Sequence, residues 1–130
     1  MEQKILLVED HPDTRDLLAL MLRSIGFTVY TADDGFEGLK LVAADCPALI
    51  ITDLHMPNLD GINMIRILRD QPECKTVPIL VVSACESRKI SDAITAGANE
   101  AICKPIDFDS LERVIARLLD QSKSQDLTAF

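Results

Sequence analysis

Five short aliphatic runs recur along the chain, and each is followed by a longer segment whose apolar residues have helical spacing. A run that is apolar on both faces predicts a strand buried on both sides, as in parallel sheets covered by helices. Right-handed crossovers place the helices on both faces of such a sheet. The alternation therefore predicts an α/β fold with a doubly wound, five-stranded parallel sheet. The predicted strands span 4–8, 27–31, 48–52, 78–83 and 100–104.

The segments between these runs predict five helices. In the first, an apolar stripe precedes Gly26, a residue type that commonly ends a helix. After the second strand, Asp33 and Asp34 fit the cap and first turn of the next helix. Either Asp107 or Asp109 is suited to cap the last one. The predicted helices span 13–25, 34–44, 61–70, 87–96 and 107–119.

Length and charge limit the classes of protein that fit. The 130 residues suit one domain, which we place at 1–121, followed by a short polar C-terminal tail at 122–130. A net charge of -8 without a basic cluster argues against nucleic-acid and membrane partners. No apolar stretch approaches the roughly 20 residues that span a bilayer, and the first one is too short for a signal peptide. We therefore expect a cytoplasmic protein.

The four cysteines are spread along the chain. Cys46, Cys74, Cys85 and Cys103 show no close pairing such as C-x-x-C. Isolated cysteines in a cytosolic chain are usually reduced. We expect four free thiols, with neither a zinc site nor a structural disulfide.

Chemistry-bearing side chains stand at the ends of four predicted strands. Glu9 and Asp10 follow the first, Asp53 follows the third, Ser83 ends the fourth and Lys104 ends the fifth. In the flavodoxin-like strand order 2-1-3-4-5, these four strands are neighbours, and ligands bind beyond their carboxyl ends. We expect the five side chains to line one cleft.

Each of these residues taken alone is more often a helix cap, a core hydroxyl or a surface lysine, but their coincidence favours a site. Three converging carboxylates repel by as much as about 4 kcal/mol per pair at an effective dielectric near 20, which calls for a cation. Oxygen ligands of this kind suit Mg²⁺. An aspartate carboxylate is also a nucleophile that forms acyl phosphates. Ser83 and Lys104 are suited to contact phosphoryl oxygens.

The segments carrying these residues are ILLVEDHPDTR, IITDLHMPNLDG, PILVVSA and AGANEAICKP. In order and spacing they resemble the receiver domain of two-component response regulators, over about residues 3–120. The resemblance implies a switch that takes a phosphoryl group from a sensor histidine kinase, or a histidine phosphotransfer protein, in a Mg²⁺-dependent step. Such a domain catalyses only its own phosphorylation and dephosphorylation, and signals through altered protein contacts.

The resemblance also implies roles for the acidic residues. Asp53 becomes the phosphoacceptor and a metal ligand, and Asp10 becomes a direct metal ligand. Glu9 holds the metal through water, and His55 contributes its backbone carbonyl. The His55 side chain either influences dephosphorylation or is a solvent-facing loop histidine.

On the fourth and fifth strands, the resemblance makes Ser83 the switch hydroxyl and Lys104 the phosphate-contacting lysine. The Lys104-Pro105 bond is expected to be cis, although only ~5–6% of X-Pro bonds are. The sequence departs from the family at Ala101, where many receivers carry a readout Tyr or Phe. The implied interaction face, for a downstream protein or a receiver dimer, is residues 84–119.

Other functions are compared with the same residues. A receiver-like scaffold that binds partners without phosphorylation is the main alternative, and the missing aromatic at Ala101 makes it conceivable. A flavin- or nucleotide-binding protein needs a phosphate-cradling loop, and neither G-x-G-x-x-G nor a P-loop occurs. A turnover enzyme such as a phosphatase is disfavoured because no second acid or base of the usual kind adjoins Asp53.

Overall fold

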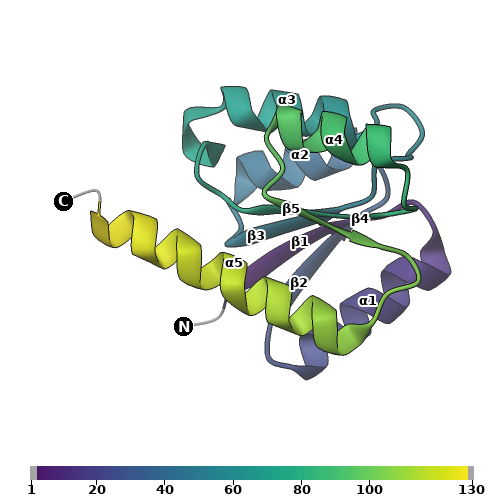
Figure 1. Ribbon diagram of the computed structural model, residues 1–130, viewed down its shortest axis with the longest axis horizontal. Helices are drawn as coiled ribbons and strands as arrows, with labels where there is room; N and C mark the ends of the chain where they lie inside the picture. The colour runs from purple at the N-terminus through teal and green to yellow at the C-terminus, as the bar shows by residue number, and fades with distance from the viewer. Residues whose placement is uncertain (1–2, 129–130) are drawn as a thin grey trace.

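The computed structural model describes residues 3–128, and side chains over residues 3–122. Five parallel strands form one sheet in the order β2-β1-β3-β4-β5 (Figure 1). This confirms the predicted strand order, and each strand lies within one residue of its predicted bounds. The strands are β1 Lys4–Val8, β2 Thr28–Ala32, β3 Leu49–Thr52, β4 Ile79–Ser83 and β5 Glu100–Cys103.

Helices cover both faces of the sheet. One face carries the second, third and fourth helices, and the other carries the first and fifth (Figure 1). A short 3-10 turn, which the sequence did not predict, follows the third helix. The elements are α1 Pro12–Ser24, α2 Gly35–Ala44, α3 Gly61–Asp70, η1 Pro72–Cys74, α4 Ser87–Ala96 and α5 Phe108–Thr128.

Each face of the sheet has its own apolar core. Alternate residues of β1 point to opposite cores: Leu6 and Val8 pack under α2 and α3, and Ile5 and Leu7 pack under α1 and α5. All four residues of β3 are buried. The three central strands are therefore fixed from both sides, which holds the groups at their carboxyl ends in place.

The helix ends follow the predicted chemistry. Gly26 has a φ of 106°, the conformation that lets the chain leave α1. The Asp34 carboxylate accepts the Glu37 N–H at the start of α2. At α5, Asp107 is the capping side chain, because its carboxylate accepts the backbone N–H of Asp109.

The predicted end of the last helix, at residue 119, was wrong. Helix α5 continues past residue 119 to Thr128, while residues 129–130 lie outside the described part of the chain. The run QSKSQD contains several good helix formers and no Gly or Pro, so nothing in it ends the helix.

The expectation of four free thiols was also wrong. A disulfide joins Cys85, in the loop after β4, to Cys103, the last residue of β5, with Cα atoms 5.0 Å apart. Cys46 and Cys74 are free. The pair could not be found by sequence spacing, because Cys85 and Cys103 come together only when β4 and β5 pair.

Arg69 ties α3 to two distant loops. Its guanidinium donates to the carbonyls of Cys74 at 2.6 Å, Val77 at 2.7 Å and Gly97 at 3.0 Å. It also donates to the Asn99 side chain at 2.9 Å. With the Lys75 carbonyl at 3.3 Å, five acceptors in the segments that precede β4 and β5 depend on this one side chain.

We expect Arg69→Met to lower the free energy of unfolding by about 2–3 kcal/mol, since these half-buried acceptors would lose a charged donor. The exposed Arg66, on the same helix, donates to the Asn63 side chain at 3.1 Å. Arg66→Met should therefore change stability by no more than about 0.5 kcal/mol. Urea denaturation measures both variants, and equal stabilities would contradict the role given to Arg69.

Candidate functional site

A lysine bridges two buried carboxylates at the carboxyl edge of the sheet. Glu9 and Asp53 are only 2% and 7% exposed. Lys104 Nζ donates to Glu9 Oε1 at 2.9 Å and to Asp53 Oδ2 at 2.8 Å. The ends of β1, β3 and β5 thus meet as predicted, and an ammonium group lies between two of the predicted carboxylates.

The two oxygens of Asp53 have different partners. Oδ1 accepts the backbone N–H groups of Leu54 at 2.6 Å and His55 at 3.3 Å, while Oδ2 accepts from Lys104. Burial works to raise the pKa of Asp53, but the hydrogen bond and charge of Lys104, with the two N–H groups, bring it below its usual value. Asp53 is therefore ionised at neutral pH and buried.

Glu9 responds in the opposite direction. Burial raises its pKa, and the charge of Asp53 adds to this against the bond from Lys104. Asp53, with its lowered pKa, stabilises the fold above the unfolded pKa, and this contribution is lost as pH falls through the folded value. Glu9, with its raised pKa, stabilises the fold below its unfolded pKa, and this contribution is lost as pH rises through the folded value. An added cation would offset this cost near neutral pH.

Asp10 completes a group of oxygen and nitrogen ligands. Potential metal-ligating atoms of Glu9, Asp10 and His11 all lie within 4.8 Å of one another. Among the described side chains, Asp10 Oδ1 is the buried polar atom without a hydrogen-bond partner, although His11 Nδ1 lies 3.5 Å away. An orphaned carboxylate oxygen beside a second carboxylate fits a hard cation such as Mg²⁺.

His11 was not singled out in the sequence, although its position directly after the acidic pair was a signal. Its side chain is 75% exposed. Imidazole is a poor ligand for Mg²⁺, so the donor set that fits this ion consists of the carboxylates.

Ser83 lies beside the lysine that bridges the carboxylates. It is 1% exposed and pairs in register with Cys103. The backbone N–H of Lys104 donates to the Ser83 carbonyl at 2.9 Å. The Lys104-Pro105 bond is cis, as predicted. The end of β4 is thus hydrogen-bonded to the residue whose side chain bonds Asp53.

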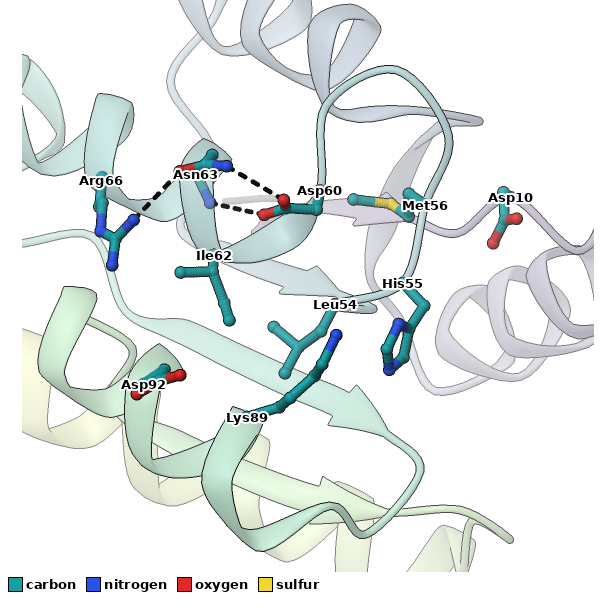
Figure 2. A pocket seen from close by; sticks show the side chains of 10 residues that line it. All are labelled: Asp10, Leu54, His55, Met56, Asp60, Ile62, Asn63, Arg66, Lys89 and Asp92. Carbon is teal, nitrogen blue, oxygen red and sulfur yellow. Dashed lines mark hydrogen bonds between the residues drawn. The ribbon is translucent and has the colours of Figure 1, made fainter.

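The loop after Asp53 borders an open pocket of about 550 Å³ that extends toward α3 and α4 (Figure 2). Asp10 lines it at one end and Arg66 at the other, and Lys89 reaches in beside His55. The His55 ring is not free: Nε2 lies 3.2 Å from Glu86 Oε1, at the start of α4. The side chain therefore links the loop after β3 to the loop after β4.

The geometry can be compared with known proteins. The family model described as the response regulator receiver domain matches residues 5–116. The chain belongs to this family. Receiver domains are the phosphoacceptor modules of two-component signalling, and they generally bind Mg²⁺ at an acidic pocket. They take phosphoryl groups from histidine kinases.

Two relatives are similar to this chain over most of its length. The chain is 35% identical to an uncharacterized 14.6 kDa protein in the sodA1 3' region of Leptolyngbya boryana, covering 88% of both chains. It is also 35% identical to response regulator MprA of Mycobacterium ulcerans, over 97% of this chain and 54% of that protein. The receiver domain thus spans about half the length of the second relative.

The fold agrees with a solved receiver structure. The chemotaxis response regulator CheY4 of Vibrio cholerae superposes with a TM-score of 0.86 at 28% identity, covering 91% of this chain and 99% of that one. In the described part of this chain, no helix is both long and apolar enough to cross a membrane.

Proposed function

We propose that Asp53 is the phosphoacceptor of this receiver domain, with Ser83 and Lys104 contacting the phosphoryl group. The observation that carries the assignment is the pairing of Lys104 Nζ with Asp53 Oδ2 at 2.8 Å. It keeps a buried carboxylate ionised, as a nucleophile must be, and supplies positive charge where a phosphoryl group would arrive.

The different partners of the two Asp53 oxygens suggest how transfer proceeds. Oδ1 is held by two backbone N–H groups, so Oδ2 is the oxygen available for attack on phosphorus. An O–P bond forms as the P–N bond of a phosphohistidine breaks, and the histidine nitrogen retains the bonding electrons and takes up a proton. Lys104 must leave Oδ2 for the phosphoryl oxygens during this step.

Magnesium fits the acidic residues beside Asp53. Asp10 and Asp53 would hold it directly, Glu9 through water, and His55 through its backbone carbonyl. When bound, it supplies charge that offsets the charge on the transferring phosphoryl oxygens. The orphaned Asp10 oxygen and the raised pKa of Glu9 both favour a cation at this position.

A small phosphodonor tests the proposed function. The purified protein would be incubated with acetyl phosphate and Mg²⁺ and then analysed as the intact chain by mass spectrometry. We expect a mass gain of one phosphoryl group that survives acid and is lost in base, as an acyl phosphate is. No gain with acetyl phosphate or with a phosphorylated histidine kinase would leave the phosphorylation-independent scaffold as the better function.

Magnesium should also stabilise the protein. A cation that binds only the folded state adds about 2.7 kcal/mol at 100 times its Kd, which raises the melting temperature. Calorimetry would compare the wild type with Asp10→Asn, which should lose most of this shift. Asp92→Asn, on the far side of the pocket, should retain it. Melting that does not respond to millimolar Mg²⁺ would contradict an assembled metal site.

The remaining assignments follow from the same proposal. The receiver domain at 1–121 would be a signalling switch without a turnover reaction on another substrate, located in the cytoplasm. Its phosphodonor would be a sensor histidine kinase or histidine phosphotransfer protein. The face at 84–119 would contact a downstream protein or a second receiver, with no nucleic-acid partner.

A further inference from the structure

The disulfide lies next to Ser83 and to Lys104, whose ammonium group bonds Asp53. Cys85 is two residues after Ser83, and Cys103 directly precedes Lys104. Ser83 and Cys103 are already paired across β4 and β5. The Cys85–Cys103 bond therefore fastens the loop that leads into α4 to the backbone that carries Lys104.

The disulfide is accessible to small reagents. Cys85 is exposed and Cys103 is half-buried. By contrast, Cys74 is a buried thiol whose pKa is raised to about 11 by burial, with the neighbouring Cys46 contributing. Exchange requires an accessible sulfur and a thiolate, so the Cys85–Cys103 pair is the better placed of the two to change its redox state.

We propose that Cys85 and Cys103 form a redox-modification site that gates phosphoryl transfer at Asp53. This inference rests on the proposed function. Disulfides in cytosolic proteins are usually transient and often sense redox state, which agrees with a site that opens and closes.

The exchange reaction balances with a low-molecular-weight disulfide as oxidant. The Cys85 thiolate attacks one sulfur of the oxidant, forms a mixed disulfide and releases one small thiol. The Cys103 thiolate then attacks Cys85 Sγ and releases the second. The two cysteine protons end on the two released thiols, and a small thiol in excess reverses both steps.

The disulfide opposes transfer by restraining Lys104. Lys104 Nζ bonds Asp53 Oδ2 and Glu9 Oε1, so it must shift before Oδ2 bonds phosphorus. Its backbone is held by the Ser83 carbonyl on one strand and, through Cys103, by Cys85 in the next loop. Reduction removes the covalent restraint and leaves the backbone hydrogen bond. The oxidised protein should therefore accept a phosphoryl group more slowly.

The proposed redox gate is tested by measuring phosphorylation while the glutathione redox potential is held constant. The full chain would be equilibrated in mixtures of reduced and oxidised glutathione and then given acetyl phosphate and Mg²⁺. Alkylation of free thiols, followed by peptide mass spectrometry, would report the Cys85–Cys103 bond. We expect uptake to be slower in the oxidised form by a factor within the roughly 5–150-fold range of allosteric couplings.

Three variants serve as controls. Cys85→Ser and Cys103→Ser should each take up phosphoryl groups at the rate of the reduced wild type in both buffers. Cys46→Ser leaves the disulfide intact and should retain the redox dependence. Since Cys85 is exposed, its variant keeps the test usable even if substitution at Cys103 disturbs β5.

An equilibrium measurement checks the same coupling. Beryllium fluoride, an inert phosphoryl mimic, should bind the reduced protein more tightly than the oxidised protein. By reciprocity, saturating beryllium fluoride should make the disulfide harder to form, by a factor equal to the ratio of the two affinities. The shift would be measured as the ratio of oxidised to reduced glutathione at which half of the protein is oxidised. Equal rates of phosphoryl uptake and equal affinities for beryllium fluoride in both redox states would overturn the redox gate and leave the proposed function intact. No uptake by reduced protein from any donor would defeat the proposed function and the gate with it.

Discussion

Asp53→Asn is expected to abolish phosphoryl uptake from acetyl phosphate. An amide oxygen does not form the acyl phosphate, and no other carboxylate occupies the position bonded by Lys104 Nζ and the Leu54 N–H. Intact mass spectrometry should find no base-labile phosphoryl group on the variant under conditions that label the wild type. The loss should be complete, because the substitution removes the nucleophile itself.

Asp60→Asn is the matched control for this prediction. Asp60 lies in the same loop, but its carboxylate caps α3 by accepting the Asn63 N–H at 2.8 Å. Asparagine also caps helices well, so the variant should fold and take up phosphoryl groups as the wild type does. Uptake by Asp53→Asn, or its loss in Asp60→Asn, would contradict the assignment of the acceptor.

Gly61→Ala is expected to lower the free energy of unfolding by roughly 3 kcal/mol, the upper end for overpacked sites. A methyl group on Gly61 would lie closer than van der Waals contact to the carbonyl oxygen of Asp53, and 2.9 Å from Leu54 Cα. Both obstacles are backbone atoms, so no side chain can rotate away. The melting temperature should fall by about 10 °C, as scanning calorimetry would measure.

Gly26→Ala separates crowding from backbone strain. Gly26 has a φ of 106°, yet nothing lies within 4 Å of an added methyl group. Its cost should be conformational, on the order of 1–2 kcal/mol. A Gly61→Ala protein that is as stable as Gly26→Ala would show that the loop after Asp53 moves aside at little cost.

The sequence predicted the fold well because its signals are local. Each strand is a contiguous aliphatic run, and Gly26, Asp34 and Asp107 act within a few residues of the helix ends that they define. The predicted end of α5 was wrong because the segment after residue 119 carries no local signal that ends a helix. The roles of Asp53, Ser83 and Lys104 remain predictions, although the structure brings all three to one edge of the sheet.

What the sequence determined by itself was the order of the elements and the residues at the strand ends. Both depend on apolar periodicity and on the rule that parallel strands end at a common edge. These two patterns identified the carboxylates after β1 and β3, the hydroxyl at the end of β4 and the lysine after β5.

Only the tertiary structure decided which of these groups touch. It placed Lys104 between Glu9 and Asp53, left one Asp10 oxygen without a partner, and joined Cys85 to Cys103. Such contacts depend on side chains far apart in the chain meeting at distances set by strand pairing and core packing. Local patterns carry no information about distances of a few ångströms between such side chains, so the bridge and the disulfide emerged only from the folded protein.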